Sequence, residues 1–186
     1  MISVPAHRNP FRPERTDALV PVLTETLPEL CARFHALGQR AVLVGRHGSG
    51  KSTLLRALAH HLGPVTWLRL RDDDRHNRGA LAALPVSIPG ILLLDGLEQL
   101  GPIGWWQVRR RASRILATSH HPGRLPTLRR HDTSPELLAQ VIAELGEPLP
   151  ADHAALFARH QGDVRACLRE LYDRAAGISR GASDAP

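Results

Sequence analysis

The residues whose types and spacing point most clearly to chemistry form one run, Gly45-Arg46-His47-Gly48-Ser49-Gly50-Lys51-Ser52-Thr53. The spacing Gly-x-x-x-x-Gly-Lys-Ser is that of a phosphate-binding loop. Glycines let such a loop turn tightly, so that successive backbone N–H groups can point at phosphate oxygens. In this arrangement Lys51 reaches the β- and γ-phosphates, and the Ser52 hydroxyl binds Mg²⁺. We therefore expect all nine residues to contribute to a nucleotide site.

The choice of lysine at position 51 supports this prediction. Lys51 is the only lysine among the 24 lysines and arginines of the chain. A guanidinium is a wide planar fork, whereas an ammonium is a compact charge that fits between phosphates. The chain thus has lysine at the one basic position where the loop requires it.

A second group of candidate residues follows the apolar run Ile91–Leu94. In phosphate-loop enzymes an aspartate at the end of such a strand helps to hold Mg²⁺, and Asp95 has this position. Glu98 is the best candidate to orient or deprotonate an attacking water. The alternative is that Asp95 only starts a turn and that Glu98 is a surface residue of a helix.

Two further polar segments are candidates for contacts with phosphate. Ser119 and His120 end the apolar run that starts at Ile115, so they can sense the γ-phosphate if that strand neighbours the strand of Asp95. The basic run 109–111, together with Arg114, follows the adjacent tryptophans Trp105 and Trp106. This run suits an arginine finger acting across subunits, a phosphate-contacting patch, or a solvated helix end that the helix dipole favours.

The elements that position these residues follow from apolar patterning. Residues 41–44 and 65–70 read as strands, and Leu54, Leu55 and Leu58 mark the helix after the loop. The wholly apolar run 91–94 suits a central parallel strand that is buried on both faces. Residues 1–14, with three prolines, read as an extended arm, Asp17 as a helix cap, and Thr26 with Glu29 as a capping box for the next helix.

The predicted fold class is α/β, a three-layer P-loop NTPase core with a parallel sheet and a small C-terminal helical lid. Thr133 and the three residues after it form a strong helix start, and three helical patterns follow. The predicted divisions are an N-terminal arm with helices (1–38), the α/β core (39–132), the helical lid (133–176) and a disordered tail (177–186).

Composition limits the class of protein and its partners. The chain has 186 residues, of which 42% are hydrophobic, and this suits one α/β domain with a small appendage. No apolar run approaches the length of a membrane span and no apolar signal core is present, so we expect a cytoplasmic protein with two free thiols, Cys31 and Cys167. The net charge of +6 favours acidic partners, including nucleic acid, although the arginines are spread and the aromatic content is only 4%.

Four segments resemble the motif series of AAA+ ATPases and their STAND relatives, especially those of NACHT type. They are GRHGSGKST, ILLLDGLEQL, RILATSHHP and HQGDVRACLREL. The resemblance implies ATP and Mg²⁺ as cofactors, Asp95 as the residue that serves Mg²⁺, and Arg165 as the sensor 2 arginine of the lid. This chain departs from the family in having Gly96 where many AAA+ proteins have the catalytic glutamate, and His120 where asparagine or arginine is usual.

These observations lead to one function and two alternatives. We expect ATP binding with slow, Mg²⁺-dependent hydrolysis by an ATPase that drives a conformational switch or an assembly, as a homo-oligomer or in a larger protein complex. The alternatives are a nucleotide-gated binding module without significant turnover, and a small P-loop kinase that transfers phosphate to a second substrate.

Overall fold

The computed structural model describes residues 4–17 and 25–178. These residues form two compact units. The α/β unit contains residues 25–46 and 50–132, and the helical unit contains residues 4–17, 47–49 and 133–178. The predicted disordered tail lies largely outside the described residues.

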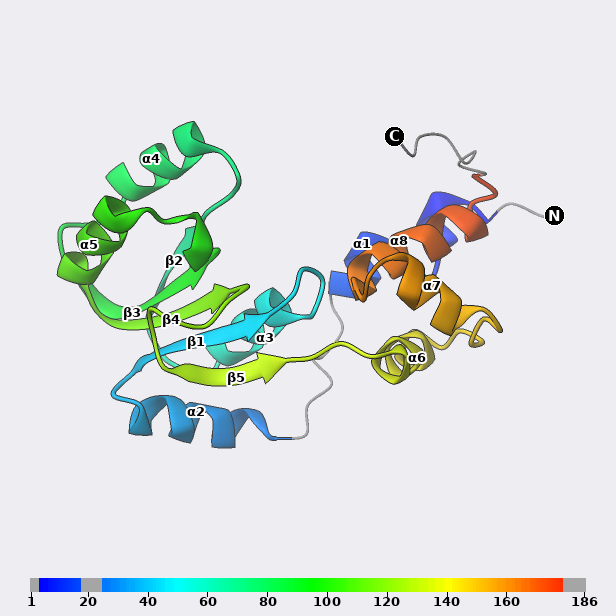
Figure 1. The fold of residues 1–186 in the computed structure, drawn as a ribbon, viewed down its shortest axis with the longest axis horizontal. Helices are drawn as coiled ribbons and strands as arrows, with labels where there is room; N and C mark the ends of the chain where they lie inside the picture. Colours follow the sequence, from blue (N-terminus) through cyan, green and yellow to red (C-terminus); the bar gives the residue numbers. More distant parts are fainter. Residues whose placement is uncertain (1–3, 18–24, 179–186) are drawn as a thin grey trace. The chain divides into compact units, whose positions relative to one another are not determined.

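A five-stranded parallel sheet is the centre of the α/β unit (Figure 1). Its strands are β1 (Arg40–Gly45), β2 (Val65–Arg69), β3 (Ile88–Asp95), β4 (Ala112–Ser119) and β5 (Thr127–His131). Their order in the sheet is β2-β3-β4-β1-β5. Because β4 lies between β1 and β3, the carboxyl ends of these three strands are neighbours at one edge of the sheet.

Helices cover both faces of this sheet. One layer contains α2 (Leu27–Ala36) and α3 (Lys51–Ala59), and the other contains α4 (Asp74–Ala82) and α5 (Pro102–Arg111), with the short 3-10 helix η2 (Leu97–Gln99) after β3 (Figure 1). The strand β3 is buried on both sides, since Ile91 and Leu93 pack in one hydrophobic cluster and Leu92 and Leu94 in the other. The three-layer α/β architecture predicted from the sequence is therefore confirmed.

The helix α2 begins where its local sequence predicts. Thr26 and Glu29 form a capping box, in which the Thr26 N–H donates to Glu29 Oε2 at 2.8 Å and the Glu29 N–H donates to Thr26 Oγ1 at 3.4 Å. Leu30 and Phe34 then face inward at helical spacing and are 0% and 1% exposed. The cap and the apolar face together position α2 on the sheet.

Three helices make up most of the helical unit, α6 (Pro135–Glu144), α7 (His153–Arg159) and α8 (Val164–Ala175). Their facing side chains form a separate core that includes Leu138, Ile142, Leu156 and Cys167. Two short N-terminal helices belong to the same unit, η1 (Ala6–Arg8) and α1 (Pro13–Asp17). The prediction of an extended arm over residues 1–14 was therefore wrong in part. Asp17 lies in α1, and the helix that it was predicted to cap falls outside the described residues.

Asn9 explains why the N-terminal segment joins this unit. Its side chain is fully buried, and its Nδ2 donates to the carbonyl oxygen of Tyr172 on α8 at 2.9 Å. Its Oδ1 accepts from the Phe11 N–H at 3.0 Å, and the Val4 N–H donates to the Ala175 carbonyl oxygen at 3.0 Å. A buried amide with both ends satisfied fixes this segment against α8.

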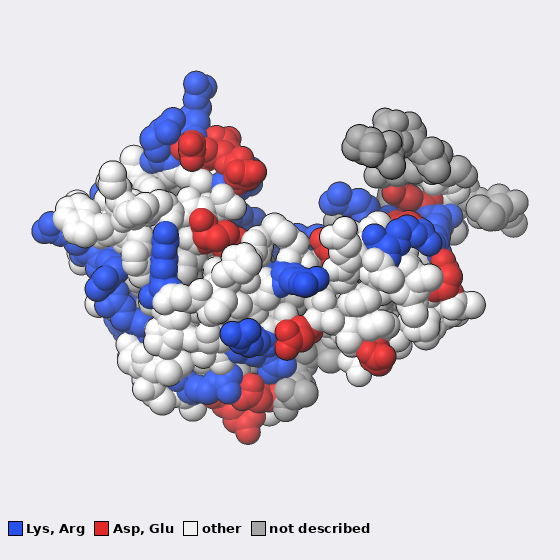
Figure 2. Space-filling model, in the orientation of Figure 1, with Lys and Arg blue, Asp and Glu red and all other residues white. Residues whose placement is uncertain are grey.

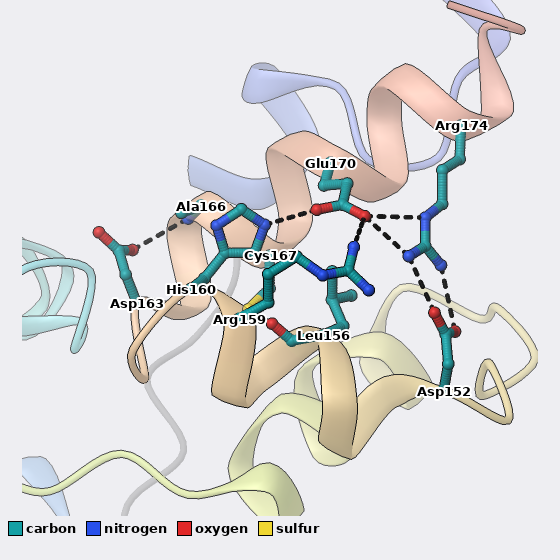
Figure 3. Close-up of polar contacts among 9 residues, drawn as sticks. All are labelled: Asp152, Leu156, Arg159, His160, Asp163, Ala166, Cys167, Glu170 and Arg174. Carbon is teal, nitrogen blue, oxygen red and sulfur yellow. Dashed lines mark hydrogen bonds and ion pairs between the residues drawn. The ribbon is translucent and has the colours of Figure 1, made fainter. Parts of the chain in front are cut away.

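Glu170 on α8 is the centre of a polar network that links α7 to α8 (Figure 3). Its carboxylate accepts from Arg159 and His160, each at 2.6 Å, and from Arg174 at 2.7 Å. Arg174 also forms a two-pronged pair with Asp152, at 2.9 and 3.1 Å. These charge-assisted bonds fix the α7–α8 pairing at its solvent-facing side.

No helix among residues 4–17 and 25–178 combines the length and the apolar character that crossing a bilayer requires.

Candidate functional site

The phosphate loop has the predicted strand–loop–helix context. It leaves β1 at Gly45 and enters α3 at Lys51. Gly50 precedes the first helical residue with φ +85°, and Gly48 has φ +67°. Side-chain-bearing residues rarely adopt this left-handed conformation, so the two glycines allow the loop to turn.

Lys51 is held inside the loop that precedes it. Its side chain is 7% exposed, and its Nζ donates to the carbonyl oxygens of Gly45 and Arg46, each at 2.6 Å. An ammonium has three donors and cannot be buried without partners of this kind. The fully buried Leu54 and Leu55 anchor the next turn of α3, which fixes the starting point of the lysine side chain. Arg46 and His47 are exposed.

Asp95, at the carboxyl end of β3, is the best-connected carboxylate of the site. Its Oδ1 accepts from Ser52 Oγ at 2.9 Å and from Thr118 Oγ1 at 2.7 Å. Its Oδ2 lies 3.7 Å from Arg69 Nε. Strand register explains the neighbours, because Arg69 of β2 is paired with Asp95, and Thr118 follows the residue of β4 that is paired with Leu94.

The donor set at Ser52 and Asp95 fits Mg²⁺. Hydroxyl and carboxylate oxygens are ligands that this hard cation prefers. The part of the chain that the structure describes contains no cluster of three or more His, Cys, Asp or Glu residues that could hold a metal ion. Ser52 and Asp95 supply two oxygen ligands, and Mg²⁺ sites commonly combine one or two protein groups with waters and substrate phosphates.

Gly96 has a backbone conformation that explains why a glutamate is absent there. Its φ is +96°, and a Cβ atom at this position would lie 3.1 Å from the carbonyl oxygen of Leu70. A side chain at residue 96 is therefore disfavoured twice, by conformation and by contact. An acid that serves this edge of the sheet must come from a different position.

Glu98 is the first acidic residue after Gly96, and its role as the water-activating acid stays a prediction. It lies on η2, whose first residue, Leu97, is buried in the core. Its Oε1 is 3.4 Å from Nδ1 of His120, which follows the last residue of β4. Both side chains keep about a fifth of their surface exposed, 23% for Glu98 and 21% for His120. The structure thus brings together two residues that the sequence predicted separately.

Ser119 and Thr118 have different environments at the end of β4. Ser119 Oγ donates to the His121 carbonyl oxygen at 2.8 Å and accepts from the His121 N–H at 3.2 Å, so it fixes the turn after the strand. Thr118 is the residue that contacts Asp95, and it also accepts from the Gly96 N–H at 3.0 Å. Thr118 was not predicted from the sequence. The sequence places it two residues before His120, but its contact with Asp95 exists because β4 lies next to β3 in the sheet.

Arg165 belongs to the helical unit. It is the second residue of α8, and Asp163 caps that helix through a hydrogen bond to the Ala166 N–H at 2.9 Å. The Arg165 side chain is exposed. Its role toward a nucleotide stays a prediction.

Comparisons with known proteins give a likeness of fold. No protein-family model matches the chain, and no curated protein matches it. Among solved structures it is similar to NtrX from Brucella abortus in complex with ATP, with 14% identity, a TM-score of 0.51 and coverage of 91% of this chain. A STAND protein with a tetratricopeptide repeat sensor, PH0952 from Pyrococcus horikoshii, matches over 78% of this chain and 29% of its own, with 13% identity and a TM-score of 0.40.

The chain spans about half of the NtrX chain, 53% of its length. The strand order, the loop between β1 and α3, and the likeness to NtrX agree with one another. The chain therefore has the predicted three-layer α/β fold with a phosphate-loop sequence between β1 and α3, and it shares this fold with NtrX.

Proposed function

We propose that this chain binds ATP with Mg²⁺ through residues 45–53 and hydrolyses it slowly. The observation that carries the proposal is the junction at the carboxyl edge of the sheet. There Ser52, Asp95 and Thr118 share hydrogen bonds of 2.7 and 2.9 Å beside a buried Lys51. ATP is the nucleotide bound by NtrX, which supports the choice of ATP here.

Lys51 has a defined role in this proposal. It moves from the carbonyl oxygens of Gly45 and Arg46 to the β- and γ-phosphate oxygens, which are stronger acceptors because they are charged. The backbone N–H groups of residues 48–53 donate to the phosphates at the N-terminus of α3. Phosphoryl transfer depends chiefly on such positioning and charge neutralisation.

Ser52 and Asp95 would hold Mg²⁺, with Thr118 keeping the Asp95 carboxylate in place through its hydrogen bond to Oδ1. The metal supplies neutralisation of charge on the phosphate oxygens. Thr118 bonds at the same time to the Gly96 backbone, so it couples the position of Asp95 to the turn that carries Glu98.

Glu98 orients the attacking water and accepts its proton in our proposal. His120 lies 3.4 Å from the same carboxylate and fixes its direction. An imidazole this close to the carboxylate competes with water for it, which supports slow turnover. Ser119 contributes indirectly, by fixing the turn in which His120 lies.

A nucleotide-gated binding module is the second candidate. It is favoured by the engagement of Glu98 with His120 and by the glycine at position 96, where no acid fits. In either case we propose that nucleotide binding is coupled to a conformational change involving Arg165 of the helical unit. The chain would act in a homo-oligomer or a larger protein complex.

The test is to measure ATP binding and Mg²⁺-dependent phosphate release over a series of protein concentrations, for the wild type and four variants. Lys51→Ala removes the buried ammonium, and Glu98→Gln and His120→Ala alter the water-facing pair. Glu144→Gln removes an exposed carboxylate from α6 and is the matched control. We expect Lys51→Ala to lose binding, and Glu98→Gln to keep binding but lose phosphate release.

Each outcome separates the candidates. Tight ATP binding without phosphate release at any protein concentration supports the binding module. Phosphate that appears on a second metabolite supports the kinase. Unchanged ATP binding by a folded Lys51→Ala variant contradicts the whole proposal.

A further inference from the structure

The exposed face of α5 carries a combination of side chains that the nucleotide site does not use. Trp106 is 57% exposed and Ile103 is 75% exposed, one helical turn apart. The guanidinium carbon of Arg110 lies 4.8 Å from the centre of the Trp106 ring, within the range of a cation–π contact. Trp105, by contrast, packs partly buried against the core.

Only some of the arginines at the end of α5 and the start of β4 have a structural role. Arg111 donates to the carbonyl oxygens of Leu81 and Leu84, at 2.7 and 3.3 Å, and Arg114 donates to that of Pro89. Arg109 is exposed, and the structure gives its guanidinium no hydrogen bond or ion pair with any described residue. Arg109 is therefore available to an external anion. Arg110 is also exposed, and its contact with the face of the Trp106 ring does not use the N–H groups of the guanidinium, which can donate to an anion.

The sequence around α5 is basic. Arg109, Arg110 and Arg111 lie on α5 and Arg114 lies in β4, whereas Arg129 and Arg130 lie on β5. Between Glu98 and Asp132 the sequence contains seven arginines and no acidic residue. Figure 2 shows Lys and Arg atoms along the edge of the molecule around α5, with no Asp or Glu atoms among them. Such a surface attracts a polyanion.

These arginines cannot act on a nucleotide held by the same chain. α5 ends at Arg111 and β4 begins at Ala112, so the last turn of α5 lies at the amino edge of the sheet. β4 has eight residues, which at about 3.3 Å per residue separate this edge from the phosphate loop by roughly 25 Å. The face is a second surface, independent of the proposed ATP site.

We propose that the exposed face of α5 binds single-stranded nucleic acid. Arg109 and Arg110 contact backbone phosphates, and Trp106 stacks on a base. Proteins that bind single strands without sequence preference combine basic side chains with exposed aromatic rings in this way. A membrane surface is a poorer match, because α5 exposes only two large apolar side chains and its other face is buried around Val108.

The test uses the full chain without ATP, so that its result does not depend on the proposed ATPase. Binding of a fluorescein-labelled deoxythymidine oligonucleotide is measured by anisotropy over a series of salt concentrations. We expect the affinity to fall with salt, and Arg109→Ala and Arg110→Ala each to reduce the slope of log K against log salt by about 0.7. Trp106→Ala should weaken binding about tenfold, and Trp106→Phe should restore most of the loss.

The matched control is Arg169→Ala, which removes one exposed arginine from α8. The proposal is overturned if the wild type does not bind at low salt, or if Arg169→Ala weakens binding as much as Arg110→Ala does. It is also overturned if Trp106→Ala binds like the wild type. If the chain binds anionic vesicles but not the oligonucleotide, the face belongs to a lipid surface. If the α5 variants lose self-association but keep oligonucleotide binding, the face belongs to a second copy of the chain.

Discussion

Replacing Thr118 by valine removes one hydroxyl from the centre of the site. Valine keeps the branched shape of threonine, so the packing of β4 is conserved. Thr118 is 2% exposed, so water cannot replace the lost group. The variant leaves the Gly96 N–H without its acceptor and removes one of the two donors to Asp95 Oδ1.

The expected loss of stability follows from these two bonds. The bond to Asp95 involves a charged acceptor, and such bonds contribute about 1.5 to 3 kcal/mol, whereas a neutral bond contributes about 0.5 to 1.5 kcal/mol. We expect Thr118→Val to lower the free energy of unfolding by about 2 to 4 kcal/mol. In a chain of this size the corresponding decrease in Tm is roughly 4 to 16 °C.

Tryptophan fluorescence isolates the relevant unit. The chain has three tryptophans, Trp67, Trp105 and Trp106, and all lie in the α/β unit. Their signal during urea unfolding therefore reports that unit rather than the helical one. Ser119→Ala, which removes the bonds to the His121 backbone, is the neighbouring control at the same strand end. If Thr118→Val is as stable as the wild type, Thr118 does not anchor Asp95 and the reasoning fails.

Three further predictions follow from single residues. Gly96→Ala should lower the stability of the α/β unit by about 1 to 2 kcal/mol, because the φ of +96° disfavours a side chain and the new Cβ would lie 3.1 Å from the Leu70 carbonyl oxygen. Urea unfolding followed by tryptophan fluorescence measures this loss. Burial raises the pKa of Glu170, but the hydrogen bond from His160 and those from a neighbouring arginine outweigh it and hold the pKa below the usual 4.5. The ionised group therefore stabilises the fold above pH 4.5, and this stabilisation is lost as the pH falls through the lowered pKa. NMR signals of α7 and α8 should change over this acid range in the wild type, and change less in Glu170→Gln. Burial raises the pKa of the Cys167 thiol to about 11, so Cys167 should resist alkylation at neutral pH until urea unfolds the helical unit, as peptide mass spectrometry would detect.

The sequence predicted those parts of the site that are local in the chain. The phosphate loop is a run of nine consecutive residues, in which the glycines allow the turn and Lys51 donates to carbonyl oxygens five and six residues before it. The capping box of α2 is equally local, since Thr26 and Glu29 lie within one helical turn. Asp95 was predictable because an apolar run that ends in a carboxylate indicates the end of a buried strand.

The contacts between strands were not predictable in the same way. Arg69 and Thr118 flank Asp95 because β2 and β4 are the neighbours of β3, and apolar patterning gives strands without giving their order. The contact between the N-terminal segment and α8 was also not predictable from the sequence. Asn9 bonds to Tyr172, 163 residues away in the sequence, and one buried asparagine has no periodicity that would indicate its partner.

Under the proposed function, the charges around Asp95 bear on how metal and nucleotide would bind together. The carboxylate already accepts two hydroxyl hydrogen bonds on Oδ1, and Arg69 lies 3.7 Å from Oδ2, so much of its negative charge is compensated. A bare dication gains little at such a group, because it must displace or oppose the guanidinium. A cation that arrives already bound to triphosphate carries a net negative charge, which Lys51 and Arg69 attract rather than repel. The arrangement therefore favours binding of Mg²⁺ and ATP as one complex over stepwise binding of the free metal, and Arg69→Ala should increase the affinity for free Mg²⁺ more than the affinity for the complex. Calorimetric titration with Mg²⁺ alone and with Mg²⁺–ATP distinguishes the two, and equal changes in both affinities would show that Arg69 does not compensate Asp95.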